Sequence, residues 1–246
     1  MIDIYSIPLY YISFDQKPEL EKMLREKGFT NINYFKAFNG KELDLDLIKN
    51  NKIISIRSYN DIKNFREQKA GMPSLGAVGC AMSHYLLWKK CIDENMDYIT
   101  IVEDDVYFSN NFSDEDLQFI DKVLSQAKSA FFGSKIYKDI NIIEMIGMQF
   151  YTISKGACEE LVKDMFPIDV QVDFYVSHLN TTGKINVDGK PLANQRMHKS
   201  SIQDFCVKCL LPKGNNFYIG LGLISLAIII LIVYFWYLFV KCKLRK

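Results

Sequence analysis

The sequence lacks an excess of charge of either sign. Its 246 residues include 30 Lys and Arg against 29 Asp and Glu, and no long basic run precedes the apolar C-terminal segment. Proteins that bind nucleic acid concentrate positive charge where they meet the phosphates, so this balance argues against a nucleic-acid partner. Internal repeats and low-complexity tracts are absent too. A chain of this length can form one α/β domain of about 200 residues with an appendage.

The sequence also has no recognisable leader and no cysteine-rich metal motif. Residues 1–8 include neither a basic start nor a cleavage site, so we expect no signal peptide. Cys206 and Cys209 have the spacing of a zinc pair, but no second pair accompanies them, which argues against zinc. No glycine-rich nucleotide loop with a basic residue is found, which disfavours a nucleotidyltransferase. Three other cysteines lie in apolar helical patterns and are expected to be buried thiols: Cys80, Cys91 and Cys158.

A long uncharged segment lies near the C-terminus. Residues 217–240 carry no charge, have aromatic residues near both ends, and are followed by a basic tail at 241–246. A helix of this length crosses a hydrocarbon layer of about 30 Å. We therefore expect a single-pass membrane protein with a C-terminal anchor, joined by a linker at 206–216 to a domain at 1–205. The alternative, a buried core helix, would not need the basic tail.

The side of the membrane on which the domain lies is less constrained. A domain that precedes its only membrane segment has a tail-anchored layout, which favours a cytosol-facing domain. The basic tail opposes this under the positive-inside rule, although so short a tail should be easy to translocate. Two glycosylation sequons begin at Asn111 and Asn180, and they would matter only for a lumenal domain.

The residue pattern of the first half predicts an α/β fold. A strand over 4–14 is followed by a helix that begins near Pro18 and ends at Gly28, and then by a strand over 34–38. A helix is predicted over 78–91, with its apolar residues at spacings of three and four. A β-α-β beginning of this kind favours a sheet with helices on its faces. The intervening residues 41–75 are polar, and we expect a loop at 71–76.

The second half continues this alternation. The segment 97–106 predicts a strand, and Ser113 with Asp116 forms a capping box for the next helix. Two further strands are predicted at 130–133 and 148–153, and Ser154 should cap a helix that runs through Met165. Residues 166–205 carry few periodic signals and are expected to be irregular.

Three consecutive carboxylates follow the strand predicted at 97–106. The segment Tyr98-Ile-Thr-Ile-Val-Glu-Asp-Asp-Val106 brings Glu103, Asp104 and Asp105 to the end of an apolar strand. Oxygen ligands in such a position suit Mg²⁺ or Mn²⁺, and a diphosphate is a frequent partner of these cations. Side chains alternate along a strand, so Glu103 and Asp105 should share one side while Asp104 points away. The alternative is a solvated acidic loop.

These residues, together with the helix upstream of them, resemble a known family. Gly76-Ala-Val-Gly-Cys-Ala-Met-Ser-His84, Trp88-Lys-Lys90 and Ile101-Val-Glu-Asp-Asp-Val106 occur in the order and spacing of glycosyltransferase family 25. Flanking matches extend the resemblance over residues 1 to about 203. It implies a GT-A-like fold (a mixed sheet with flanking helices) and a nucleotide-sugar donor, usually a UDP-hexose. One departure stands out, because the family's Asn-Leu-Asp-Arg at the end of the first strand is replaced by Ser13-Phe-Asp-Gln16.

The resemblance and the chemistry together suggest roles for individual residues. Asp105 is predicted to bind Mn²⁺ or Mg²⁺ directly, and Glu103 to bind the cation, its water or the donor ribose. His198 could supply a late metal ligand or be an ordinary exposed histidine. The proton of the acceptor hydroxyl needs a base, for which Asp173 is the first candidate and Asp169 the second, a helix cap or surface carboxylate being the alternative. The remaining residues expected near the donor are Asp104, Ser13, Ser83 and His84.

The leading hypothesis is a membrane-anchored, metal-assisted and inverting hexosyltransferase. It would move galactose or glucose from UDP to a hydroxyl on a glycan, a lipid-linked sugar or a hydroxylysine. The alternative is an inactive relative that serves as a membrane-tethered binding or structural module, and the departure at Ser13–Gln16 motivates it.

Overall fold

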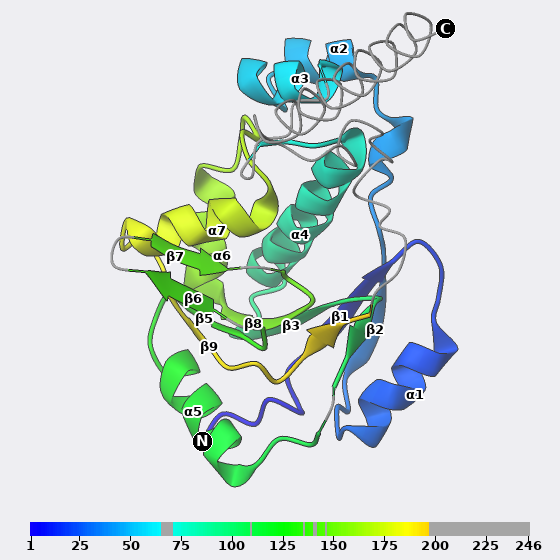
Figure 1. Ribbon diagram of the computed structural model, residues 1–246. Helices are drawn as coiled ribbons and strands as arrows, with labels where there is room; N and C mark the ends of the chain where they lie inside the picture. The colour runs from blue at the N-terminus through cyan, green and yellow to red at the C-terminus, as the bar shows by residue number, and fades with distance from the viewer. Residues whose placement is uncertain (65–70, 109, 135, 140–141, 146, 197–246) are drawn as a thin grey trace, which may run out of the picture. The chain divides into compact units, whose positions relative to one another are not determined.

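The computed structural model describes residues 1–64, 71–108, 110–134, 136–139, 142–145 and 147–196 (Figure 1). These residues belong to one compact unit, Met1–Asp204. The remaining unit, Phe205–Lys246, lies outside the described residues, and so do the predicted membrane span and basic tail. Among the helices that are described, none is long and apolar enough to cross a membrane.

A six-stranded mixed sheet forms the centre of the unit, in the order β2-β1-β3-β8-β5-β9. Strand β1 runs parallel to both β2 and β3, β8 runs antiparallel to β3 and β5, and β5 runs parallel to β9. This mixed sheet with flanking helices confirms the α/β prediction and fits a GT-A-like fold. The strand bounds are β1 Leu9–Ser13, β2 Ile32–Lys36, β3 Tyr98–Glu103, β5 Ser129–Phe132, β8 Phe150–Ser154 and β9 Asn186–Gly189.

Helices cover both faces of the sheet (Figure 1). Helices α4 (Leu75–Asp93), α6 (Lys155–Lys163) and α7 (Val172–Thr181) pack on one face, and α1 (Pro18–Glu26) and α5 (Asp114–Leu124) on the other. Strand β3 contributes to both cores, because Ile99 and Ile101 join the first cluster while Val102 joins the second. This alternation is the two-residue period of a strand that is buried on both faces.

Local signals in the sequence explain where several helices begin and end. Ser113 caps α5 in a reciprocal capping box with Asp116, and the Ser154 side chain caps α6 at the backbone N–H of Ala157, as predicted. Gly28 adopts a φ of 101° just after α1, a conformation that glycine tolerates without steric cost. Helix α4 begins earlier than predicted, because Ser74 caps it from the expected loop.

Several boundaries differ from the sequence predictions. Residues 166–205 are not irregular throughout, because they contain α7, β9 and the short strand β10 (Asn194–Gln195). The first strand begins at Leu9 rather than at residue 4, since the chain turns before it. The polar stretch 41–75 and the region after Val106 hold further short elements, which are η1 (Gly40–Glu42), α2 (Leu45–Asn50), α3 (Ile56–Lys63), β4 (Val106–Tyr107), β6 (Ile136–Asp139) and β7 (Ile142–Met145). Elements this short carry too few residues for a periodic signal.

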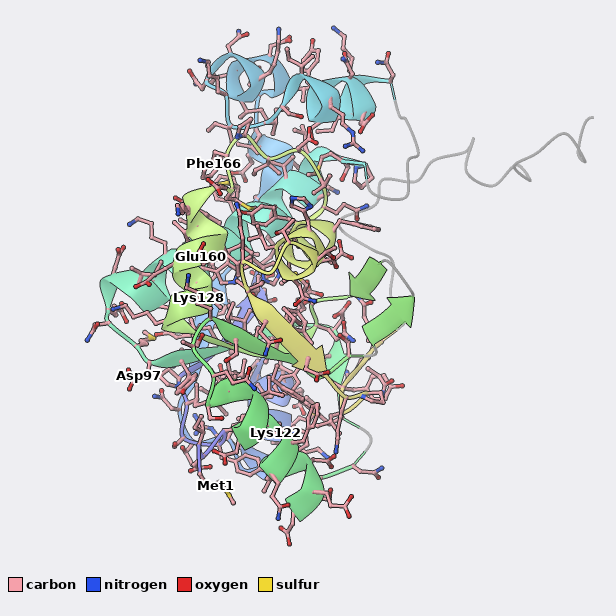
Figure 2. The ribbon with its side chains drawn as sticks, turned by 90° about the vertical axis from the view of Figure 1, so that its left-hand side faces the viewer. Met1, Asp97, Lys122, Lys128, Glu160 and Phe166 are labelled. Carbon is pink, nitrogen blue, oxygen red and sulfur yellow. The ribbon has the colours of Figure 1, made fainter. Side chains whose placement is uncertain are left out.

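Several charged residues lie near the start of β3. Figure 2 labels Asp97 just before this strand, and Lys128 beside Glu160 of α6. The Lys128 Nζ atom lies 2.7 Å from Glu160 Oε1. Exposed pairs of this kind contribute little to stability. The three consecutive carboxylates lie at the other end of β3, where Glu103 is the last residue of the strand.

Candidate functional site

Two neighbouring parallel strands end side by side at the candidate site. Ile12 of β1 is in register with Glu103 of β3, so the residues that follow each strand meet. The Ser13 hydroxyl donates to Asp104 Oδ2 at 2.6 Å, and Lys17 Nζ lies 3.8 Å from the same oxygen. Asp104 therefore turns toward β1. Its binding partners there are a hydroxyl and a lysine rather than the helix N–H groups of a cap.

A cavity of about 920 Å³ opens at this edge of the sheet. Its size is that of a pocket for a small ligand or cofactor. Lys17, Lys41 and Arg196 supply positive charge to its wall, and Glu103, Asp104 and Asp105 supply negative charge. All five predicted donor-site residues line it: Ser13, Ser83, His84, Glu103 and Asp104.

The wall formed by residues 37–41 depends on a close contact between two glycines. A Cβ atom on Gly79 would lie 2.5 Å from the Gly40 nitrogen, and one on Gly40 would lie 1.8 Å from the Leu75 carbonyl oxygen. Ser83 strengthens the contact, because its hydroxyl accepts from the Phe38 N–H at 2.9 Å and donates to the Gly79 carbonyl at 2.9 Å. The hydrogen bonds of Ser83 thus hold the wall of the cavity.

Three potential metal ligands come together deeper in the site. One ligand atom each from Cys80, His84 and Glu103 lie within 4.8 Å of one another. His84 Nε2 is 3.3 Å from Glu103 Oε1, and Cys80 Sγ is 3.9 Å from that oxygen. Burial and the nearby Glu103 carboxylate raise the pKa of the Cys80 thiol well above its ordinary value. In the absence of a metal, Cys80 is therefore a thiol at neutral pH.

Among the residues that the structure describes, one buried oxygen atom of Asp105 has no hydrogen-bond partner. Its Oδ2 atom accepts from Gln195 Nε2 at 2.7 Å, and its backbone carbonyl accepts from the Arg196 N–H at 2.8 Å. Within the described residues, its Oδ1 atom is buried and has no hydrogen bond. Burial raises the pKa of Asp105, and the neighbouring carboxylates Glu103 and Asp104 raise it further. A buried carboxylate oxygen in this state suits a bound cation.

The two predicted bases are placed differently. Asp173 lies in the first turn of α7, where it accepts from the backbone N–H groups of Phe174 and Gly147. Burial raises its pKa, and the charge of Glu103 adds to this effect. Asp169 accepts from the Ser55 hydroxyl and from Arg57 Nη1, the latter at 3.2 Å. Neither residue lines the cavity, but only Asp173 is close enough to interact with Glu103 and Cys80. His198 lies outside the described residues.

Comparison with known proteins identifies the family. The family model described as "Glycosyltransferase family 25 (LPS biosynthesis protein)" matches residues 6–176. This range includes β1, α4, β3 and Asp173. The chain belongs to glycosyltransferase family 25. The resemblance stated from the motifs around His84 and Glu103 is thereby confirmed.

Several curated relatives carry glycosyltransferase names. A "Glycosyltransferase 25 family member" of Drosophila pseudoobscura pseudoobscura is 28% identical over 141 residues, which cover 53% of this chain and 21% of the relative. A "Putative glycosyltransferase" of Haemophilus influenzae is 35% identical over 127 residues, which cover 45% of this chain and 44% of the relative. The human "Procollagen galactosyltransferase 2" is 27% identical over 109 residues, which cover 44% of this chain and 16% of the relative. The matched part thus spans about a fifth of the first relative's length.

In this family 25 chain, sequence reasoning missed part of the cavity wall. Lys17 directly precedes α1, Lys41 belongs to the short helix η1, and Arg196 follows β10, which pairs with β4 beside Asp105. The contact of Gln195 with Asp105 had no signal in the sequence either. A short antiparallel pairing between residues so far apart in the chain is invisible to local patterns.

The raised pKa values of Asp105 and Asp173 predict how stability depends on pH. The folded chain holds these protons more tightly than the unfolded chain, so their contribution is fully present below the ordinary carboxyl pKa of 3.8 and is lost as the pH rises through the raised values. Without metal, the wild type should therefore lose stability relative to Asp105→Asn as the pH rises above the ordinary carboxyl pKa. Denaturant titration at several pH values measures the difference, and a constant gap would contradict the expectation.

Proposed function

We propose that this protein transfers a hexose, galactose or glucose, from a UDP-sugar to an acceptor hydroxyl, with metal assistance and inversion at the anomeric carbon. The observation that carries the proposal is Asp105, whose buried Oδ1 has no hydrogen bond among the described residues, at the mouth of a cavity lined by three basic residues. A cation and basic side chains can both neutralise a donor diphosphate, and this wall combines a carboxylate suited to a cation with three basic residues.

Asp105 is the residue best suited to hold the cation, and Glu103 can supply a second carboxylate ligand. Their carboxylates offer the hard oxygen ligands that Mn²⁺ and Mg²⁺ take, and a cation would relieve the burial penalty at Asp105. When bound, such an ion neutralises the charge that develops on the leaving diphosphate. His198 stays a proposed additional ligand.

Asp173 is the base that we propose for the acceptor proton. Its raised pKa brings the carboxylate closer to the working range of a general base, because a base is most effective when its pKa is near the ambient pH. Asp169 is less suitable, since Ser55 and Arg57 already occupy both of its oxygens.

Lys17 takes the place of the arginine that the family has at the end of the first strand. It lines the cavity just after Ser13–Gln16 and lies 3.8 Å from Asp104, and both ends of this pair are accessible to a ligand. We expect Lys17→Ala to weaken the binding of UDP in the presence of Mn²⁺ about 10-fold or more, the loss of one hydrogen bond to a charged group.

Lys22→Ala is the matched control for this prediction. Lys22 is exposed on α1 and does not line the cavity, so removing its charge changes the net charge equally without touching the site. Isothermal titration calorimetry compares the two variants. Equal UDP affinity in both would remove Lys17 from the donor site.

The proposed function is tested with the full-length chain, UDP-galactose or UDP-glucose, and Mn²⁺. We expect release of UDP by slow hydrolysis without an acceptor, and faster release with a suitable glycan, lipid-linked sugar or hydroxylysine peptide. The departure at Ser13–Gln16 favours one competing reading, an inactive membrane-tethered binding module. Absence of UDP binding with Mn²⁺ present would decide for that module.

We further propose that residues 217–240 anchor the protein in a membrane, with the cytosolic side as the expected location of the domain. The two glycosylation sequons differ in how well their glycan occupancy can show on which side of the membrane the domain lies. Asn111 is exposed, whereas the Asn180 side-chain nitrogen is buried and its oxygen accepts from the Val187 N–H at 2.9 Å. In the folded chain, glycan occupancy at Asn111 is therefore the informative observation.

A further inference from the structure

A chain of buried hydrogen bonds runs from α4 through β8 to the cavity. Trp88 Nε1 donates to the Tyr151 hydroxyl at 2.9 Å, and that hydroxyl lies 2.8 Å from His84 Nδ1. His84 Nε2 is 3.3 Å from Glu103 Oε1, which belongs to the cavity wall. The side chains of Trp88, Tyr151 and His84 are fully buried. Water therefore cannot supply a missing partner to any of them.

The proton positions in this chain follow from simple counting. The indole nitrogen of Trp88 can only donate, so the Tyr151 oxygen accepts from it. The hydroxyl proton of Tyr151 must then go to another acceptor, and His84 Nδ1 is the one that the described residues provide. If Nδ1 carried a proton, the Tyr151 oxygen would face two donors, and its own buried proton would have no acceptor.

We propose that Trp88 and Tyr151 are positioning residues that fix His84 as the neutral tautomer protonated on Nε2, which donates to Glu103 Oε1. The proposal rests on the proposed function in one respect only, the assignment of Glu103 to the donor site. Because His84 holds Oε1, the carboxylate keeps a single orientation. Within the described residues the other oxygen, Oε2, has no hydrogen bond and is available to the donor ribose or a metal-bound water.

The same tautomer decides whether Cys80, His84 and Glu103 form a metal site or a hydrogen-bonded cluster. A metal ligand must present an unprotonated nitrogen, and here Nε2, the nitrogen that faces Glu103, carries the proton. His84 is therefore a hydrogen-bond donor to Glu103 and not a ligand for a soft cation such as Zn²⁺. The cation of the donor site is then left to carboxylate oxygens.

Nitrogen-15 NMR of labelled histidine tests the tautomer without any turnover. The chain has 3 histidines, so Gln substitutions at His178 and His198 assign the signals of His84 in the full-length protein, kept in mild detergent because of its apolar C-terminal segment. We expect an unprotonated Nδ1 and a protonated Nε2, unchanged when Zn²⁺ is added. A protonated Nδ1, or loss of the Nε2 proton on adding Zn²⁺, would overturn the proposal.

Tyr151→Phe tests whether positioning matters for the ligand. Removing the hydroxyl should leave His84 in a mixture of tautomers and weaken UDP binding with Mn²⁺ about 10- to 100-fold, the usual effect of losing a residue that orients a binding group. Tyr98→Phe is the control, because Tyr98 lies at the opposite end of β3 from Glu103 and its hydroxyl donates to the Leu124 carbonyl at 3.1 Å. This variant should change neither the His84 signals nor the UDP affinity.

Two outcomes separate this inference from the proposed function. If Tyr151→Phe does not fold, Trp88→Phe removes the indole donor and should likewise release the tautomer. An unchanged His84 signal in the folded variant would give Tyr151 a purely structural role and reject the proposal. If the wild type itself does not bind UDP, the donor-site assignment fails, while the tautomer of His84 is still decided by its NMR signals.

Discussion

Asp105→Asn is expected to lower Mn²⁺-dependent sugar transfer on the order of 100- to 1,000-fold, the usual effect of losing one group that stabilises charge in a transition state. Asparagine keeps the size of the side chain and, through its carbonyl oxygen, an acceptor for Gln195. What it loses is the negative charge that a cation needs. The folded protein should be at least as stable as the wild type at neutral pH, because a buried carboxylate with a raised pKa is replaced by a neutral amide.

This prediction is specific because Asp105→Asn should lower activity without lowering stability. A kinetic assay with UDP-sugar measures the first, and thermal unfolding with and without Mn²⁺ measures the second. Mn²⁺ at about 100 times its Kd should stabilise the wild type by about 2.7 kcal/mol and the variant by much less. Asp93→Asn is the control, since Asp93 forms an exposed ion pair with Lys89 on the surface. Transfer that survives Asp105→Asn at the wild-type rate would refute the metal assignment.

Gly79→Ala is expected to destabilise the fold by about 2 kcal/mol or more, although alanine is the better helix former by about 1 kcal/mol. The added methyl group would lie 2.5 Å from the Gly40 nitrogen and 2.6 Å from the Phe38 carbonyl oxygen, which are backbone atoms that cannot rotate away. Residues 37–41 would have to move off α4. Because these residues line the cavity, UDP affinity should fall together with stability.

Gly156→Ala in α6 is the matched control for this steric effect. Its new methyl group would lie 3.2 Å from the nearest atom, so a small shift can accommodate it. Thermal unfolding of both variants, followed by UDP titration below their melting temperatures, separates a general loss of stability from a displaced cavity wall. A Gly79→Ala variant that is as stable as Gly156→Ala would show that residues 37–41 do not need this contact.

The long elements of the fold could be predicted because each carries its own periodic pattern. Helix α4 and strand β3 were located within a few residues, and Ser113 and Ser154 cap the helices that they were expected to cap. Helix α7 was missed although its buried residues Val172, Val176 and Leu179 have helical spacing, because the helix is only 10 residues long and lies in a segment whose other residues are polar. Strands β4 and β10, only two residues each, are stabilised by pairing with one another and carry no local signal.

The candidate site also has features that could be predicted from the sequence and others that could not. The sequence by itself determined that three carboxylates end a buried strand and that His84 and Ser83 lie on the helix upstream, because these features are contiguous or follow helical spacing. Only the tertiary structure decided what each carboxylate does. Asp104 pairs with Ser13, Glu103 with His84, and Asp105 with Gln195. These partners come from a parallel strand, a helix and the end of the domain, and a hydrogen bond depends on distances in space that sequence separation does not encode.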